Sequence, residues 1–359
     1  MRVRPRPEVD ALPGYRLTVV PAPIKLNQNE SPYDLPPEVK EEVLGTLRSV
    51  PWNRYPPMRA GRLREAIARL QGVKPEKVIL TNGSNEAILA LISAFAAGGT
   101  VVLPEPGYSM ARPLAVTAGA HAVAVRLRED LSMDPDALLS AAAASCASMI
   151  FFASPNNPTG RAVPPDDVER IVAGFRGLVV VDEAYWGFSE GTALRLLPER
   201  ANVAVVRTAS KAFGLAGVRV GWVTASRDVI AALDKTLPPY NLDVFAQAAA
   251  EAMVRRPDLV RERASQVVRE RERVLEALRA LGVEAFASEA NFILFRTPDA
   301  AATFDGLARR GVLVRDVSHF PMLDGCLRVT VGTPPDNDAF LQALRQALPR
   351  VRASGGRSV

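Results

Sequence analysis

The sequence has few of the residues from which disulfide frameworks, metal centres and membrane spans are built. Its 359 residues include only two cysteines, Cys146 and Cys326, which cannot form a disulfide framework and lack the spacing of metal ligands. The most apolar window, residues 87–103, is interrupted by Gly98 and Gly99, so it is expected to form a buried helix followed by a strand. We therefore expect no metal site and no membrane-spanning segment.

Lysine is also scarce, because only six of the 44 basic residues are lysine and the rest are arginine. These residues are spread along the chain and the net charge is only +5, so nucleic-acid binding is not expected. Arginine binds carboxylates and phosphates through two parallel hydrogen bonds, which favours small anionic substrates as partners. The first ten residues are charged and no apolar stretch follows them, so we expect no secretory signal and a cytoplasmic protein.

The order of apolar segments predicts an α/β fold, and a length of 359 residues favours a large domain with a smaller one. Strands are predicted at residues 78–80, 101–103, 149–152, 178–181, 203–206 and 218–223. Helical segments lie between several of them, which favours a mainly parallel sheet covered by helices. Residues 243–281 read as one long helical stretch, with Pro257 as a candidate break point, before a second, smaller α/β unit.

Two ionisable residues follow predicted buried strands. Lys211 has the apolar neighbours Ala212 and Phe213, and burial would lower its pKa and leave a neutral amine able to attack a carbonyl. A surface lysine at the end of a strand is the ordinary alternative. Asp182 comes directly after the strand at 178–181, at the edge where parallel sheets bind ligands. A helix cap is the alternative role for Asp182. A metal site is not expected there, because no histidine lies nearby in the sequence.

Two turn motifs and one arginine are further candidates. Residues 156–160, NNPTG, follow a strand and have the composition of a turn. Residues 81–85, TNGSN, open a helix after a strand, where free backbone N–H groups suit a phosphate, although a plain turn is the alternative. Arg219 lies between Gly217 and Gly221 in a predicted buried strand, and an unpaired buried charge there would need an anion nearby.

Taken together, three strings in this order resemble the fold-type-I aminotransferases: NNPTG at 156–160, DEAY at 182–185 and SKAFGLAGVRVG at 210–221. The resemblance covers the chain from about Lys25 to Leu348. It implies a large domain with a mainly parallel seven-stranded sheet covered by helices, plus a smaller α/β domain. The implied division is an N-terminal arm that is part of the small domain (1–42), a large cofactor-binding domain (43–242), and a long inter-domain helix with the C-terminal small domain (243–359).

The resemblance also implies pyridoxal 5′-phosphate as the cofactor, held as a Schiff base by Lys211, which would then move the substrate proton. Asp182 would pair with the pyridinium nitrogen and make the ring a better electron sink. Asn157 and Tyr185 would bind the phenolic oxygen of the cofactor, and Tyr108 would stack on its ring. The residues implied for the cofactor phosphate are Ser84, Asn85, Thr208, Ser210 and Arg219.

The resemblance extends to the substrate and to a partner subunit. Arg328 matches the arginine that binds the substrate α-carboxylate through two parallel hydrogen bonds. Tyr55, in the NRYP string at 53–56, resembles the tyrosine that reaches the cofactor phosphate of the other subunit. A homodimer with two shared active sites is therefore implied.

Within the superfamily, the chain is most similar to the histidinol-phosphate aminotransferases. The LNQNESP string at 26–32, the RYP string at 54–56, and Arg315, thirteen residues before Arg328, carry this likeness. Arg315 is thereby implied to bind a substrate phosphate. The implied reaction moves an amino group from glutamate to imidazole-acetol phosphate and gives histidinol phosphate and 2-oxoglutarate, a step of histidine biosynthesis.

Some positions depart from the pattern of that family, and they concern the choice of substrate. Pro57, Gly107 and Ala111 replace residues that are common in it, while Tyr15 and Tyr33 are both candidates for the N-terminal aromatic that covers the substrate. Together with Asn157, Tyr15 completes the expected substrate-binding set. The alternatives are an aromatic or broad-range amino-acid aminotransferase, a lyase of the threonine-phosphate decarboxylase type, and a non-catalytic ligand-binding module.

Overall fold

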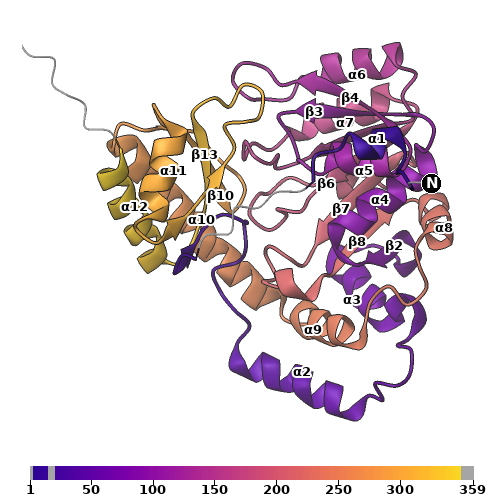
Figure 1. Ribbon diagram of the computed structural model, residues 1–359. Helices are drawn as coiled ribbons and strands as arrows, with labels where there is room; N and C mark the ends of the chain where they lie inside the picture. The colour runs from indigo at the N-terminus through magenta and orange to yellow at the C-terminus, as the bar shows by residue number, and fades with distance from the viewer. Residues whose placement is uncertain (1–2, 15–20, 349–359) are drawn as a thin grey trace, which may run out of the picture.

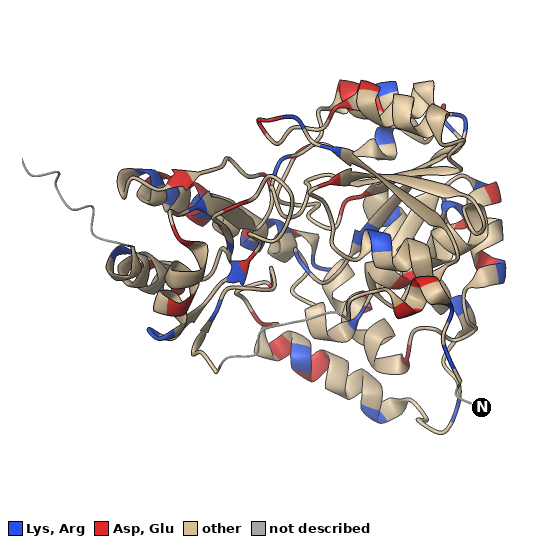
Figure 2. Cartoon of the chain, turned by 45° about the horizontal axis from the view of Figure 1, so that its top comes forward, with Lys and Arg blue, Asp and Glu red and all other residues tan. Residues whose placement is uncertain are grey.

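The computed structural model describes residues 3–14 and 21–348. Tyr15, predicted to cover the substrate, lies outside the described residues. Within them, no helix is both long and apolar enough to cross a membrane. Basic and acidic residues are interspersed along the helices in the view of Figure 2.

A seven-stranded sheet forms the centre of the larger unit (Figure 1), in the order β2-β8-β7-β6-β5-β3-β4. Its strands are β2 (Val78–Thr81), β3 (Thr100–Glu105), β4 (His121–Arg126), β5 (Met149–Ala153), β6 (Leu178–Asp182), β7 (Val203–Thr208) and β8 (Gly221–Ala225). All neighbours are parallel except that β8 runs antiparallel to β2 and β7. The predicted mainly parallel sheet of seven strands is therefore confirmed.

Helices cover both faces of this sheet because alternate residues of its strands point to opposite sides. The helices are α4 (Gly83–Phe95), α5 (Ala111–Thr117), α6 (Pro135–Ala144), α7 (Pro165–Gly174) and α8 (Arg227–Thr236). Val180 of β6 packs in one core with residues of α4, α5 and α8. Its neighbours Val179 and Val181 pack in the opposite core with residues of α6 and α7. Strands buried on both faces read as continuous apolar runs, which is why most of them could be predicted.

A third core lies beside β2 and β8 and contains Leu80 and Trp222. It is completed by α2 (Pro37–Ser49), α3 (Gly61–Gln71) and α9 (Val244–Val254). Helix α2 packs against α9 through Val39, Val43 and Leu47, which recur every fourth residue and so lie on one side of the helix.

The smaller unit is built around a four-stranded antiparallel sheet in the order β12-β13-β10-β9. Its strands are β9 (Glu284–Ala285), β10 (Phe292–Arg296), β12 (Arg315–Asp316) and β13 (Cys326–Thr330), and its helices are α11 (Ala300–Ala308) and α12 (Pro334–Ala347). The N-terminal strand β1 (Ile24–Lys25) pairs with β11 (Val312–Leu313) beside this sheet. The segment at β1 therefore packs with the C-terminal part of the chain. Nearer the N-terminus the chain instead contacts the larger unit, where Arg6 donates to the backbone carbonyls of Val116 and Thr117 at the end of α5.

One long helix, α10 (Pro257–Ala280), joins the two units (Figure 1). Its first half contributes Val260 and Val267 to the core beside β2 and β8, and its second half contributes Leu275 and Leu278 to the core of the smaller unit. The helical stretch predicted from 243 to 281 is thus two helices, since α9 ends at Val254. Pro257 begins α10 because proline has no N–H to donate and suits the first turn of a helix.

The predicted strand at 218–223 is also corrected. Residues Ala216–Val218 form a short 3-10 helix, and Arg219 follows it with a left-handed backbone at φ 63°. Strand β8 begins only at Gly221. Arg219 therefore lies in a turn at the start of the strand and is exposed, so the expected buried charge is not found.

Candidate active site

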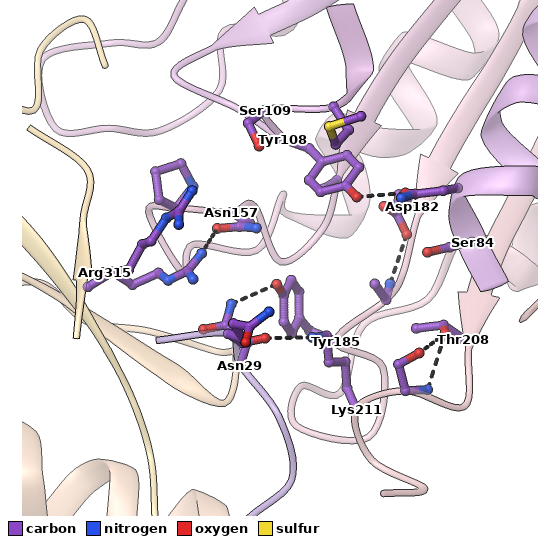
Figure 3. Close-up of a pocket in the computed structure, with 18 of the residues that line it drawn as sticks. Asn29, Ser84, Tyr108, Ser109, Asn157, Asp182, Tyr185, Thr208, Lys211 and Arg315 are labelled. Atoms are coloured by element: carbon purple, nitrogen blue, oxygen red, sulfur yellow. Dashed lines mark hydrogen bonds between the residues drawn. The ribbon is translucent and has the colours of Figure 1, made fainter. Parts of the chain in front are cut away.

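The candidate site is a cavity of about 540 Å³ between the two units. One wall is formed at the carboxyl ends of β5, β6 and β7, where parallel strands direct their loops, and the other wall by β12 and β13 of the smaller unit. Figure 3 shows Arg315 on one side of it and Asp182, Ser84 and Thr208 on the other. The structure thus gathers nearly all the predicted residues around one space.

Lys211 lies in the loop that follows β7, and its side chain reaches into the cavity. Its Nζ donates a hydrogen bond to the backbone carbonyl of Gln28, with a distance of 3.0 Å. Burial, reinforced by the positive charge of Arg328, lowers the pKa of Lys211 from 10.5 to about 8. About a tenth of this amine is therefore neutral and nucleophilic at pH 7, far more than for an ordinary lysine.

Asp182 is the last residue of β6 and its side chain is buried at the floor of the cavity. Its Oδ1 accepts a hydrogen bond from the backbone N–H of Ala184 (3.0 Å). Burial raises the pKa of Asp182 from 3.8 to about 7. Within the described part of the chain no ion pair includes Asp182. A carboxylate of this kind fits a ligand that brings a protonated ring nitrogen, because such a partner offsets the cost of burying its charge.

Two tyrosines and an asparagine surround the space above Asp182. Tyr185 is buried and its hydroxyl accepts a hydrogen bond from Asn29 Nδ2 (2.9 Å). The Tyr108 hydroxyl donates to Asn85 Oδ1 (2.6 Å), which fixes the ring at the edge of the cavity. Asn157 follows β5 and its Oδ1 accepts a hydrogen bond from Arg328. All three side chains therefore face the same ligand space.

The first turn of α4 and the loop after β7 form a cup of hydrogen-bond donors. Ser210 Oγ accepts hydrogen bonds from Thr208 Oγ1 (2.9 Å) and from the Arg219 guanidinium (3.3 Å). Ser84 and Asn85 belong to the first turn of α4, where backbone N–H groups lack helical partners. Hydroxyls, an arginine and a helix N-terminus in one place suit a phosphate group.

Glycine at position 83 is required for this cup. Gly83 has φ +74°, and a Cβ atom there would come within 2.3 Å of the Arg219 guanidinium. A Cβ atom on Gly221 would likewise come within 2.8 Å of the Ser84 backbone nitrogen. The two glycines let the arginine and the helix N-terminus approach the same point, so the residues present fit a phosphate.

Two arginines from neighbouring strands line the opposite wall. Arg315 of β12 lies directly across from Arg328 of β13 in the antiparallel register. Side chains in such positions share one face of the sheet, and two like charges there repel each other unless an anion binds between them. Arg328 also donates to the backbone carbonyl of Asn27 (2.9 Å) and to Asn157 Oδ1. This wall therefore suits a ligand with one or two anionic groups.

Tyr55 does not lie in the cavity of its own chain. Its side chain is 81% exposed and stacks on Tyr240, with 4.5 Å between ring centroids. The sequence resemblance assigned it to the site of a second subunit, and that assignment remains a prediction.

Sequence reasoning missed several residues around the site. Val317, His319 and Phe320 line the cavity beside Arg315, and they lie in a loop whose path follows from the pairing of β12 with β13. The ion pair of Glu183, which directly follows β6, and Arg207 of β7 adjoins Asp182. An arginine inside the otherwise apolar string VAVVRT was the available signal for that pair.

The comparisons with known proteins agree with this geometry. The sequence family described as "Aminotransferase class I and II" matches residues 21–344. The chain is 42% identical to histidinol-phosphate aminotransferase of Thermococcus kodakarensis, over 95% of this chain and 97% of the relative. It is 39% identical to histidinol-phosphate aminotransferase of Chlorobaculum tepidum, over 90% of this chain and 94% of the relative.

Among solved structures, histidinol-phosphate aminotransferase of Sinorhizobium meliloti in complex with pyridoxal-5′-phosphate has the same fold. Its TM-score is 0.87 at 24% identity, and the match covers 97% of this chain and 98% of that one. Because the relatives match over nearly their whole length, the chain belongs to the class I and II aminotransferase family and, more narrowly, to the histidinol-phosphate aminotransferases.

Proposed function

We propose that this protein transfers an amino group between glutamate and imidazole-acetol phosphate, giving histidinol phosphate and 2-oxoglutarate. The observation that carries the proposal is the composition of the cavity between the two units: a reactive amine, a buried carboxyl group and a phosphate cup face a pair of arginines. The relatives named histidinol-phosphate aminotransferase support the same substrate.

The residues of the cavity fit pyridoxal 5′-phosphate, which is the proposed cofactor. When bound, this cofactor supplies an aldehyde that takes up the amino group and an aromatic ring that accepts electrons. Asp182 holds the ring nitrogen, and Asn157 and Tyr185 bind the phenolic oxygen, while Tyr108 covers the ring. The residues that hold the phosphate are Ser84, Asn85, Thr208, Ser210 and Arg219.

Lys211 is both the attachment point and the group that moves the proton. With a pKa of about 8, its Nζ can accept and donate a proton near neutral pH. The Gln28 carbonyl accepts a hydrogen bond from Nζ and thereby keeps the amine inside the cavity. Lys211 is therefore positioned to carry a proton to and from the Cα atom of the substrate.

The arginine wall binds the substrates. Arg328 binds the α-carboxylate of glutamate, and Arg315 binds the phosphate of the imidazole substrate. Because the two side chains lie on one face of the small sheet, the same pocket accepts both substrates in turn. Asn157 Oδ1 accepts a hydrogen bond from Arg328 and thereby holds that arginine for the carboxylate. Tyr15 is the residue proposed to cover the substrate.

We further propose a homodimer in which Tyr55 reaches the cofactor phosphate of the partner. A set of large apolar side chains is exposed on the two chain segments that contain Tyr55 and Tyr240. The stacking of these two rings brings the segments together. The set consists of Trp52, Tyr55, Met58, Tyr240 and Phe245. Exposed apolar groups in such a set are typical of an interface between proteins.

The division into an arm (1–42), a large cofactor-binding domain (43–242) and a small domain with the long helix (243–359) also remains a proposal. The pairing of β1 with β11 supports assigning the part of the arm around β1 to the small domain, whereas Arg6 contacts α5 of the large domain. We propose the cytoplasm as the location, because Cys146 and Cys326 are both free thiols, which suit a reducing compartment.

A substrate panel tests the reaction. Purified holoenzyme is assayed with histidinol phosphate, phenylalanine and threonine phosphate as donors and 2-oxoglutarate as the acceptor. We expect the kcat/KM for histidinol phosphate to exceed that for phenylalanine by about two orders of magnitude, the value of one charge-assisted contact. Equal values would instead identify a broad-range aminotransferase, and release of carbon dioxide from threonine phosphate would identify a lyase.

A further inference from the structure

Asn29, in the arm between β1 and α2, contacts both units of the fold. Its side chain is buried and its backbone is left-handed, with φ 52°. Asparagine adopts this conformation more readily than other residues with a side chain. The Asn29 carbonyl accepts a hydrogen bond from Asn291 Nδ2 (3.1 Å), and its side chain reaches the Tyr185 hydroxyl of the larger unit. The residue therefore links the smaller unit to the cavity.

The Asn29 amide is oriented with Oδ1 toward Thr330 and Nδ2 toward Tyr185. The Thr330 hydroxyl accepts a hydrogen bond from the Asn29 backbone N–H (2.9 Å) and lies 3.1 Å from Asn29 Oδ1. A hydroxyl has a single proton, and an amide oxygen can only accept. The Thr330 proton is therefore donated to Oδ1, and the Asn29 Nδ2 group faces Tyr185.

This arrangement fixes the direction of the Tyr185 proton. Asn29 Nδ2 can only donate, so the Tyr185 hydroxyl must accept along this contact (Figure 3). Burial raises the pKa of Tyr185, so the hydroxyl keeps its proton at neutral pH. Among the residues that the structure describes, Asn29 is its hydrogen-bond partner. The proton is thus available to an acceptor in the cavity.

We propose that Asn29 is a positioning residue that directs the Tyr185 hydroxyl proton toward the phenolic oxygen of the cofactor. The inference rests on the proposed function and adds a residue to it. Thr330 sets the amide of Asn29, and Thr330 lies two residues after Arg328 on β13. The strand that binds the substrate carboxylate therefore also determines which way this proton points.

The test measures the apparent pKa of the bound cofactor from the visible absorption of the holoenzyme as a function of pH. A hydrogen bond donated to the phenolic oxygen favours its ionised form and lowers that pKa. We expect Tyr185→Phe to raise it by about one unit. Asn29→Asp replaces the Nδ2 donor by an acceptor of the same shape, which draws the Tyr185 proton away, so a similar rise is expected.

A double variant separates this effect from the charge that Asn29→Asp introduces. In the Tyr185→Phe background, Asn29→Asp should change the pKa by less than about a third of its effect in the wild type. Equal shifts in both backgrounds would show that only the added charge acts, and the positioning role would be wrong.

A neutral pair of variants tests the role of Thr330 independently. Thr330→Ser keeps the hydroxyl and should leave the pKa of the cofactor unchanged. Thr330→Val removes the hydroxyl that orients the amide and should raise that pKa. Identical titrations for these two variants would overturn the inference while leaving the proposed function intact. A wild-type protein that binds no chromophore would overturn both.

Discussion

Arg207 and Glu183 form an ion pair in which both side chains are only 2% exposed. Arg207 donates to Glu183 Oε2 through Nε (3.0 Å) and a terminal nitrogen (2.8 Å), and its guanidinium lies 4.1 Å from the ring centre of Trp186. The two residues adjoin Asp182 and Thr208, which face the cavity from the ends of β6 and β7. The pair therefore supports the floor of the active site from behind.

Arg207→Ala is expected to lower the free energy of unfolding by about 3–5 kcal/mol, because it leaves the Glu183 carboxylate buried without its partner. Denaturant unfolding of the protein without cofactor measures the loss. Arg195→Ala is the matched control, since its partner Glu169 and Arg195 itself are 49% and 43% exposed. That control should cost less than about 1 kcal/mol. Equal losses for the two variants would contradict the prediction.

Cofactor attachment to the protein should follow the titration of Lys211. Because its pKa is about 8, the neutral and reactive fraction of the Lys211 amine falls as the pH drops below 8 and approaches one as the pH rises above it. Stopped-flow absorbance should show the attachment rate falling about tenfold per pH unit on the acid side and levelling off on the basic side. A rate that continues to rise toward pH 10, as for an ordinary lysine, would count against this prediction.

Borohydride reduction followed by peptide mapping identifies the residue to which the cofactor is attached. The label should be found on Lys211 and be lost in Lys211→Arg. Lys235→Arg is the control at an exposed lysine and should be labelled like the wild type.

Asp182→Ala should retain the covalent attachment but slow amino transfer by orders of magnitude. The buried carboxyl group is the partner proposed for the ring nitrogen, and without it the ring is a poorer acceptor of electrons. Single-turnover spectra with glutamate measure the rate, and absorbance after dialysis measures retention. Near-normal turnover in this variant would refute the role of Asp182.

Arg315→Ala should weaken binding of histidinol phosphate far more than binding of glutamate. Loss of a hydrogen-bonded charge contact costs about 1.5–3 kcal/mol, or roughly tenfold to a hundredfold in affinity. Half-reaction titrations with each substrate give the two affinities. Arg328→Ala, across the strand pair, should show the opposite preference and weaken glutamate more, because Arg328 is the residue proposed for the α-carboxylate. Equal losses for both substrates in Arg315→Ala would remove Arg315 from the phosphate role.

Tyr55 is expected to act in the site of the partner subunit. Tyr55→Ala and Lys211→Ala should each reduce activity strongly. A mixture that is unfolded and refolded together should regain activity, because one site of each hybrid dimer then has Lys211 from one chain and Tyr55 from the other. Each variant refolded alone is the control. If Tyr55 served its own chain, no hybrid would contain an intact site and the mixture would stay inactive.

Local patterns explain why much of the fold and site could be predicted. The strands buried on both faces are continuous apolar runs, so β5, β6 and β7 stand out in the sequence. Asp182 and Lys211 come directly after two such strands, and parallel strands bring those ends together. Apolar runs of this kind predicted most strands of the sheet, whereas its seven strands were implied by the family resemblance.

Features that depend on distant contacts could not be predicted. The strand β4 (His121–Arg126) lies at the edge of the sheet and is only partly buried, so its sequence has no run of large apolar residues. Arg219 was assigned to a strand because its left-handed turn has no local signal in the sequence GVRVG. Asn29 and Thr330 are 301 positions apart, and no local pattern joins them.

The cavity contains several cations but a single amine. Among the described residues that line it, Lys211 is the one lysine, and the other basic side chains include Arg219, Arg315 and Arg328. Guanidinium groups remain protonated at any pH at which the protein is folded, so they do not condense with aldehydes as a neutral amine does. The arginines of the pocket can therefore attract an anionic carbonyl compound, while only the nitrogen of Lys211 forms a covalent adduct with it.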